Sequence, residues 1–206
     1  MIKTVTFDFG GVLYSYDGEK FLEILSARSN VDKETIGERM SGSRLDIAHF
    51  KGEVEAPELL KILEDRIGLN MTRDELAKAY ADIVGPNEEM FDLVRELKND
   101  YNLQLYSDTP KILYDHVMVH MPIIDMFSAT TLSFELGELK DSSKGYREMI
   151  DKSGHLPEEI VFIDDKEKVI DKANEFGING VRFRSLEDLL EQLKKLGVSP
   201  DGKFDL

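Results

Sequence analysis

The sequence of 206 residues contains no cysteine, which excludes a disulfide framework and thiol chemistry. It also lacks any apolar run near the roughly 20 residues that a membrane-spanning helix needs. A predicted strand begins at Ile2, so we expect no room for a cleavable leader before it. These absences favour a protein of the reducing cytoplasm and argue against a membrane partner.

Positive charge is also scarce, with 26 Lys and Arg residues against 41 Asp and Glu residues and a formal net charge of −15. Electrostatics therefore argues against nucleic acid or an anionic membrane surface as a partner. A phosphorylated ligand is compatible with this charge if its pocket holds a cation. The patterns G-x-G-x-x-G and G-x-x-x-x-G-K-[ST] do not occur, so the common nucleotide-binding loops are not indicated.

What the chain does contain is an alternation of predicted strands and helices. After residue 87, β-favouring runs alternate with helical periodicity, which is typical of a parallel sheet with helices on both faces. We expect strands at 2–9, 103–106, 128–132, 160–163 and 180–183. The predicted fold class is therefore α/β, with a Rossmann-like parallel core sheet. A frayed tail is expected at 199–206.

Residues 21–83 differ from the rest, because their apolar residues recur at helical spacing. Thr72-Arg73-Asp74-Glu75 has the S/T-x-x-E form of a capping box, which predicts the start of a helix. We therefore predict an all-helical insertion, or cap, at 15–85. The core would be built from 1–14 and 86–206.

Polar side chains stand at the carboxyl ends of three predicted strands: Asp8, Ser107 and the pair Asp164-Asp165. Function gathers at this edge of a parallel α/β sheet. A single Asp at a strand end is more often a helix cap than a functional residue. Taken alone, Ser107 is as often an N-cap as a binding residue, and Lys140 is more often a solvated surface residue. The combination of all these residues at one sheet edge weighs against such structural interpretations.

Asp164-Asp165 is the clearest pair. Adjacent carboxylates repel each other unless a cation lies near, and Mg²⁺ is usually held by one or two carboxylates with water and substrate phosphate. Asp8 adds a third carboxylate at the same edge. This favours a metal site over the simpler interpretation of acids at a helix start.

Ser107 lies directly before a predicted helix, and the backbone N–H groups around Asp108 and Thr109 are a favourable place for an anion. Lys140, in a loop that follows Gly137, can bring a positive charge to a phosphate. Carboxylates, a hydroxyl and an ammonium at one sheet edge are the groups that phosphoryl transfer requires.

These motifs resemble those of the haloacid dehalogenase-like (HAD) hydrolases over nearly the full length of the chain. They are Asp8-x-Gly10, Ser107, Gly137-x-x-Lys140 and Asp164-Asp165. The helical insertion is similar to that family's C1 cap. The first strand and the loop 132–140 are most similar to its sugar-phosphate phosphatase-like branch.

The resemblance implies a role for each motif residue. Asp8 would be the nucleophile that forms an aspartyl-phosphate, and Lys140 would neutralise the phosphate and position Asp8. Ser107 and Asp108 would bind the phosphate together with Lys140. The metal would be Mg²⁺, and its implied ligands are Asp8, the carbonyl oxygen of Gly10, Asp165, and Asp164 directly or through water.

Three positions depart from that family's pattern. Gly10 replaces the acid that usually protonates the leaving group, a step typically worth about 10² to 10⁴ in rate. Lys140 is not followed by the usual proline, so Lys144 is a conceivable rival, although the position of Tyr146 favours Lys140. Asp108 stands where Asn is common.

Tyr14, Tyr16 and Asp17 follow the glycine turn, and we expect both tyrosines to be exposed. One of these residues could supply the missing proton, but we favour a flexible flap lined by polar residues. In the insertion, Arg44 and His49 are candidates for substrate contact with no stronger case than surface residues.

The sequence favours a Mg²⁺-dependent phosphomonoester hydrolase that acts on a small phosphorylated metabolite such as a sugar phosphate. Activated esters would be preferred because a proton donor is missing. The alternative is a HAD-fold binding or regulatory protein with little or no catalysis. Gly10 supports this alternative, whereas the otherwise complete motif set opposes it. The sequence leaves the oligomeric state open.

Overall fold

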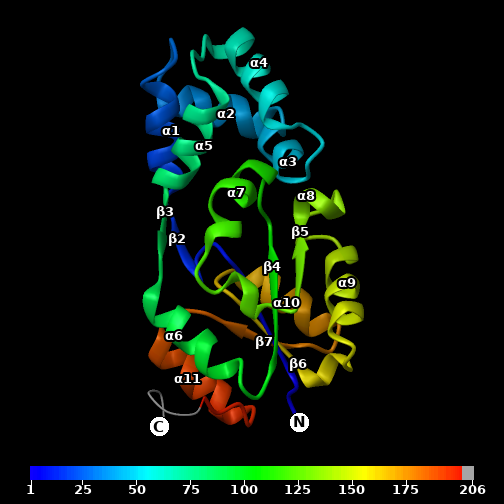
Figure 1. Cartoon of the computed structure of the whole chain (residues 1–206). Helices are drawn as coiled ribbons and strands as arrows, with labels where there is room; N and C mark the ends of the chain where they lie inside the picture. The colour runs from blue at the N-terminus through cyan, green and yellow to red at the C-terminus, as the bar shows by residue number, and fades with distance from the viewer. Residues whose placement is uncertain (201–206) are drawn as a thin grey trace.

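A five-stranded parallel sheet forms the centre of the molecule in the computed structural model, which describes residues 1–200 (Figure 1). Its strands, in chain order, are β1 (Thr4–Phe7), β4 (Asn102–Ser107), β5 (Ala129–Leu132), β6 (Ile160–Asp164) and β7 (Asn179–Arg182). In space the order is β5-β4-β1-β6-β7. The predicted α/β fold with a parallel sheet is confirmed.

The first strand of the chain lies in the middle of this sheet. Thr4 of β1 aligns with Asn102 of β4 on one side and with Ile160 of β6 on the other. All four residues of β1 are buried, as expected of a parallel strand that is covered on both faces. This register places the carboxyl ends of β4, β1 and β6 next to one another.

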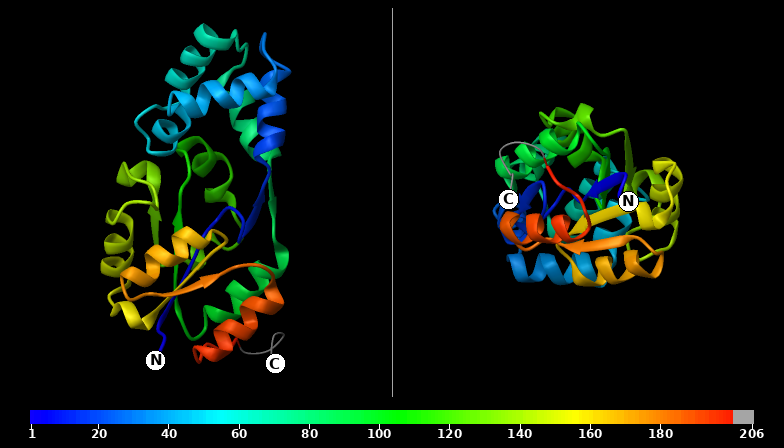
Figure 2. Two further views of the ribbon diagram at one scale, coloured as in Figure 1. Left: turned by 180° about the vertical axis from the view of Figure 1, so that it is seen from behind. Right: turned by 90° about the horizontal axis from the view of Figure 1, so that it is seen from below.

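Helices cover both faces of the sheet (Figure 2). Successive strand side chains point to opposite faces, and Ile163 and Phe162 accordingly belong to two separate buried clusters. The Ile163 cluster includes α6 (Glu88–Leu97) and α11 (Leu186–Lys195), and the Phe162 cluster includes α9 (Lys144–Ser153) and α10 (Glu167–Glu175). The remaining helices of this part are short: α7 (Lys111–His116), α8 (Ser133–Leu136) and 3₁₀ turns at Met118–His120, Ile124–Met126 and Pro157–Glu159.

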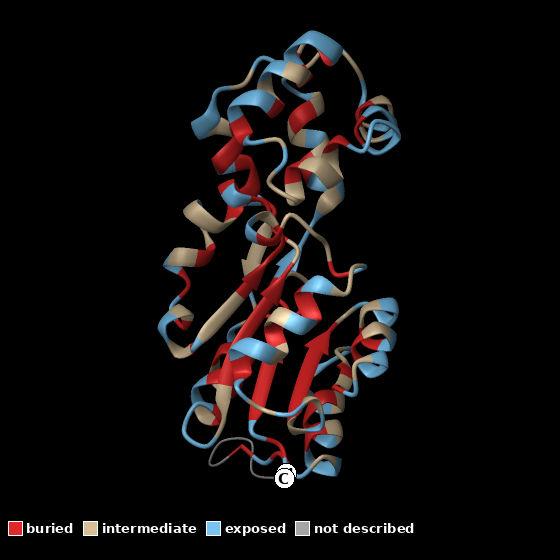
Figure 3. Ribbon diagram, turned by 90° about the vertical axis from the view of Figure 1, so that its right-hand side faces the viewer, coloured by how far each residue is buried: buried red, intermediate tan, exposed pale blue. Residues whose placement is uncertain are grey.

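Five helices form a separate layer above the carboxyl edge of the sheet (Figure 1). They are α1 (Gly18–Ser26), α2 (Lys33–Gly42), α3 (Leu45–Phe50), α4 (Ala56–Ile67) and α5 (Arg73–Asp82). Their buried residues face one another inside this layer (Figure 3). The predicted capping box is confirmed at the start of α5, where Thr72 and Glu75 bond each other's backbone N–H.

Two short strands connect this helical layer to the rest of the chain. β2 (Tyr14–Tyr16) and β3 (Val84–Pro86) pair in antiparallel fashion, with Tyr16 opposite Val84. The sequence did not predict this ribbon, because each strand has only three residues and its partner is far along the chain. Both predicted boundaries of the insertion, at 15 and 85, fall inside the ribbon.

No helix in residues 1–200 is both long and apolar enough to cross a bilayer. The predicted frayed tail at 199–206 falls mostly outside the described residues.

Candidate active site

The sheet order brings the predicted strand-end residues together. Asp8 follows β1, Ser107 ends β4 and Asp164 ends β6, and β1 lies between the other two strands. All three residues are buried, at 4%, 1% and 0% exposed. Buried carboxylates and hydroxyls are costly unless they find partners, and the partners here define the site.

Lys140 is the central partner of the carboxylates. Its Nζ lies 2.7 Å from Asp8 Oδ1 and 2.7 Å from Asp164 Oδ2. It also lies over the rings of Tyr106 and Phe162, at 5.3 and 5.4 Å from their centroids. Burial alone would lower the pKa of Lys140, but the nearby carboxylates outweigh burial and raise it. Lys140 is therefore a fixed cation.

The geometry separates Lys140 from its predicted rival Lys144. Lys144 Nζ donates to the backbone carbonyl of Leu136 at 2.6 Å, whereas Lys140 reaches both buried carboxylates. Of the two lysines, Lys140 is the one placed to act on a group bound at Asp8.

The two carboxylates beside Lys140 differ in their acidity. Burial raises the pKa of Asp8 to about 7, with the Lys140 ammonium opposing part of this rise. Burial also disfavours ionised Asp164, but Lys140 and the Lys166 N–H group outweigh it and lower the pKa of Asp164. The difference fits the bonds: both oxygens of Asp164 are held, by Lys140 Nζ and by Lys166 N at 2.8 Å.

Asp8, Asp164 and Asp165 each offer a carboxylate oxygen, and these oxygens lie within 4.8 Å of one another. Asp165 Oδ1 is buried and has no hydrogen-bond partner among residues 1–200. An unpartnered buried carboxylate oxygen and a surplus of negative charge suit a hard divalent cation. The residues present therefore fit Mg²⁺, with Asp165 and Asp8 better placed as direct ligands than the fully bonded Asp164.

The phosphate-binding prediction is only partly matched by the geometry at the end of β4. Ser107 Oγ makes one long contact of 3.5 Å with the Asp108 carbonyl. The Asp108 carboxylate accepts the backbone N–H of Lys140 at 3.0 and 3.3 Å and so ties β4 to the lysine loop. The Thr109 N–H donates to Ser133 Oγ at 2.9 Å. The Thr109 N–H is therefore engaged, and the expected anion site around Asp108 and Thr109 stays a prediction.

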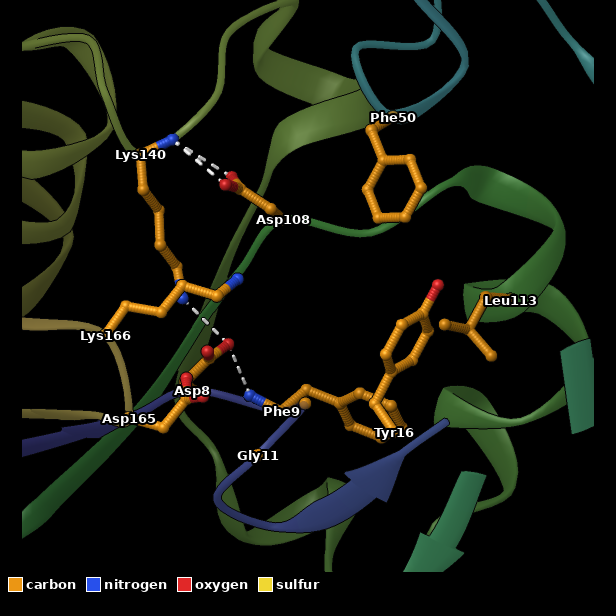
Figure 4. A pocket seen from close by; sticks show the side chains of 11 residues that line it. Asp8, Phe9, Gly11, Tyr16, Phe50, Asp108, Leu113, Lys140, Asp165 and Lys166 are labelled. Atoms are coloured by element: carbon orange, nitrogen blue, oxygen red, sulfur yellow. Dashed lines mark hydrogen bonds and ion pairs between the residues drawn. The ribbon is translucent and has the colours of Figure 1, made fainter. Parts of the chain in front are cut away.

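A cavity of about 290 Å³ opens over the carboxylates (Figure 4). Asp8, Gly10, Asp108, Lys140 and Asp165 line its polar end. The opposite side of the cavity is lined by Tyr16, Phe50 and Leu113, so the helical layer and β2 complete its wall.

Lys166 also lines the cavity, and our sequence reasoning did not single it out. It directly follows Asp165, immediately before α10, and Figure 4 shows its side chain reaching over Asp8. Its Nζ forms no ion pair within residues 1–200. The sequence feature that could have identified Lys166 is its position next to the acidic pair.

The two glycines near Asp8 differ in whether the local structure requires glycine. Gly11 has φ +83°, and a Cβ there would lie 2.7 Å from Asp165 Cγ. Glycine is therefore required at position 11 by both conformation and space. Gly10 has no positive φ, and the nearest atom to an added Cβ would be Tyr16 Cβ at 3.9 Å.

Comparison with known proteins agrees with this arrangement. The model of the haloacid dehalogenase-like hydrolase family matches residues 2–177. The chain belongs to the haloacid dehalogenase-like hydrolases. It is 26% identical over 200 residues to a D-ribitol-5-phosphate phosphatase of Bacteroides thetaiotaomicron, covering 94% of this chain and 97% of that enzyme.

Solved HAD structures share the fold. A predicted HAD-like hydrolase from Porphyromonas gingivalis superposes with a TM-score of 0.84 at 26% identity, covering 97% of this chain and 99% of that one. A HAD family enzyme from Bacteroides thetaiotaomicron, in complex with magnesium and inorganic phosphate, gives a TM-score of 0.81 at 24% identity, covering 90% and 96%. The chain is thus a HAD hydrolase with phosphatases among its relatives.

The residues just after the HAD glycine turn do not form one polar flap. Tyr14 is buried and stacks on Phe9, with ring centroids 4.5 Å apart, so the expectation that it is exposed was wrong. Asp17 caps α1 by accepting the Lys20 N–H at 2.9 Å. Tyr16 alone among the three residues proposed from the sequence lines the cavity.

His49 of the helical layer is also not a surface residue. It is 3% exposed, and its Nδ1 donates to the Val54 carbonyl at 2.7 Å. Burial lowers the pKa of His49 and keeps the ring neutral. Arg44, the other candidate, is exposed and has φ 54°.

The helical layer is bonded directly to the HAD core beside the cavity. Ser133 Oγ lies 2.6 Å from the Phe50 carbonyl, and the same oxygen accepts the Thr109 N–H. Lys51 Nζ pairs with Glu138 Oε2 at 3.1 Å. Ser133 therefore links the cavity wall at Phe50 to the loop that follows β4.

Proposed function

We propose that this HAD hydrolase is a Mg²⁺-dependent phosphomonoester hydrolase that works through an aspartyl-phosphate. The observation that carries the proposal is the group of Asp8, Lys140, Asp164 and Asp165, buried except for the half-buried Asp165, beside a cavity. A carboxylate attacks a phosphate dianion only when cations offset the repulsion between them, and this group supplies one cation and a fitting site for another.

Asp8 would be the nucleophile. Its Oδ1 is held by Lys140 Nζ and by the Phe9 N–H at 2.7 Å, so Oδ2 is the oxygen that these two donors leave to attack phosphorus. Lys140 would neutralise the phosphoryl group, and Ser107 would rotate to donate to it. Asp108 would act in phosphate binding by fixing the Lys140 backbone.

The Mg²⁺ ligands in this proposal are Asp8, the Gly10 carbonyl and Asp165, with Asp164 near or through water. When bound, the ion would polarise the phosphoryl oxygens and offset charge in the transition state. The structural neighbour in complex with magnesium and inorganic phosphate supports Mg²⁺ as the cofactor.

The substrate would be a small phosphorylated metabolite, such as a sugar or sugar-alcohol phosphate. The relative that acts on D-ribitol 5-phosphate supports this class. A second cavity of about 360 Å³ between the helices of the insertion shares Tyr16 and Phe50 with the first. We propose residues 15–85 as a cap that covers the leaving group, and 1–14 with 86–206 as the core.

The alternative function, a HAD-fold binding or regulatory protein with little catalysis, rests on Gly10. Nothing in the local backbone requires glycine at this position, so the usual acid is absent for a reason other than folding. The intact set of Asp8, Lys140 and the acidic pair favours hydrolysis.

The test is phosphate release from a panel of phosphorylated metabolites with Mg²⁺ and with EDTA. We expect Mg²⁺-dependent turnover that Asp8→Asn abolishes while circular dichroism shows an intact fold. Asp171→Asn, an exposed change on α10, is the matched control and should keep full activity. Binding of phosphorylated ligands without turnover of any would establish the alternative, and turnover by Asp8→Asn would refute the covalent mechanism.

A further inference from the structure

At position 10 the chain has glycine where HAD hydrolases usually carry the acid that protonates the leaving group. A side chain built there would meet no atom closer than Tyr16 Cβ, at 3.9 Å, and the backbone is in an ordinary conformation. The side chain that begins nearest to this position is therefore that of Tyr16, which the chain supplies from β2; the near atom is its Cβ and not its hydroxyl.

Tyr16 is directed into the cavity. Figure 4 shows its ring reaching in from β2, with the hydroxyl toward Phe50 and Leu113 and away from the Asp8 carboxylate. It lines both the cavity over the carboxylates and the one inside the helical insertion. Its hydroxyl bonds to no residue in the part of the chain that the structure describes.

The two lysines of this cavity are engaged or lie on the side of the attacking oxygen, and Asp108 accepts the backbone N–H of Lys140. In phosphoryl transfer the attacking and leaving oxygens are roughly in line, so the leaving oxygen departs on the side opposite Asp8. Lys140 is bonded to Asp8 and Asp164. Lys166 reaches over Asp8 itself (Figure 4), where it faces the phosphoryl oxygens. Tyr16 is on the side where the leaving group must extend.

We propose that Tyr16 donates the proton to the leaving group in place of the acid that Gly10 lacks; this inference rests on the proposed hydrolase function. As Asp8 bonds to phosphorus and the ester P–O bond breaks, the phenolic proton passes to the leaving oxygen. In the second step water attacks the aspartyl-phosphate and gives a proton to the phenolate. Phosphate and Asp8 are released, and Tyr16 is again a phenol.

The acidity of the side chain is compatible with this cycle. Partial burial raises the pKa of Tyr16, so the phenol is protonated before the reaction. An alkoxide leaving group is more basic than a phenolate, so the transfer is downhill. The proposal also removes the preference for activated esters that the missing acid alone would impose.

The experiment compares p-nitrophenyl phosphate with benzyl phosphate, which both carry an aromatic ring but differ in leaving-group basicity, because benzyl phosphate releases an alkoxide. For Tyr16→Phe we expect kcat/KM to stay within about threefold for p-nitrophenyl phosphate and to fall about 10²-fold for benzyl phosphate, the lower end for loss of a general acid. Tyr14→Phe, on the same strand but packed on Phe9, is the matched control and should leave the ratio unchanged.

An equal effect of Tyr16→Phe on both esters, or none on either, would overturn the inference and leave the hydrolase function standing. Absence of Mg²⁺-dependent turnover of both esters by the unaltered chain would instead refute the hydrolase function, and the inference with it. A double variant, Tyr16→Phe with Gly10→Asp, should recover benzyl phosphate hydrolysis. A folded double variant that recovers none counts against Tyr16 as the donor.

Discussion

Replacing Asp8 by asparagine should stabilise the Mg²⁺-free protein, although it removes the proposed nucleophile. Burial raises the pKa of Asp8 from 3.8 to about 7, with Lys140 opposing part of the rise. Between these values the folded state holds a proton that the unfolded chain has lost. The contribution of Asp8 to stability is therefore present at low pH and is lost as pH rises through about 7.

The size of the effect follows from this pKa. A tenfold change in acidity corresponds to about 1.4 kcal/mol, so ionised Asp8 costs at most about 4 kcal/mol at pH 8. Asparagine is neutral and can still accept from Lys140 Nζ. We expect Asp8→Asn to gain about 2–4 kcal/mol, which moves the urea midpoint upward by about 1–2 M if m is about 2 kcal/mol/M.

Asp164→Asn is the matched control, because it changes the same charge on the other side of Lys140. The pKa of Asp164 is lowered in the folded state, so its carboxylate contributes stability at neutral pH that is lost on acidification. We expect this variant to lose about 3 kcal/mol, as when a buried ion pair is broken. Urea unfolding in EDTA at pH 8 measures the stability of both variants. When Mg²⁺ replaces EDTA, it should stabilise the unaltered protein more than it stabilises Asp8→Asn. A loss of stability in Asp8→Asn under these conditions would refute the reasoning.

Three further changes test other contacts of the site. Gly11→Ala should lower the free energy of unfolding by about 1–2 kcal/mol because Gly11 has a left-handed conformation, and it should also weaken Mg²⁺ binding about tenfold by displacing Asp165. Gly137→Ala, at φ +70° with open space around it, should show only the conformational cost. Equal Mg²⁺ affinities of the two variants in calorimetric titrations would contradict this prediction. Ser133→Ala should lose about 1–3 kcal/mol in urea unfolding, because it leaves the Phe50 carbonyl and a loop N–H without their partner; an unchanged midpoint would show that this bond is not formed in solution. Lys166→Met should weaken competitive inhibition by inorganic phosphate about three- to tenfold, a modest effect because the side chain is exposed and screened, and an unchanged inhibition constant would remove it from phosphate binding.

Residues whose positions depend on local pattern were predictable. Asp8, Ser107 and Asp164 each follow or end a run of β-favouring residues, and a parallel sheet aligns such ends at one edge whatever the strand order. Lys140 was predictable from its loop motif, and the structure distinguishes it from Lys144 by its contacts with two carboxylates.

Contacts that depend on tertiary packing were not predictable. His49 reads as polar in sequence, but its place on α3 buries it against the rest of the insertion. Ser133 lies in the loop motif at 132–140, but the motif does not give its partner, and its bond to Thr109 exists because β5 lies beside β4. The direction of Tyr16 depends on the pairing of β2 with β3, which spans the whole insertion.

The β2–β3 ribbon makes the helical insertion an exchangeable unit. Because Tyr16 lies opposite Val84, the chain leaves the core and returns to it at a single place, and a tight turn in place of 17–83 would convert the ribbon into an ordinary hairpin. A different helical insertion could be joined at the same two neighbouring junctions without altering the register of the central sheet. In the proposed hydrolase, recombination of this kind would exchange substrate choice, and junctions at 17 and 83 would leave Tyr16 in place although it belongs to the proposed cap of 15–85.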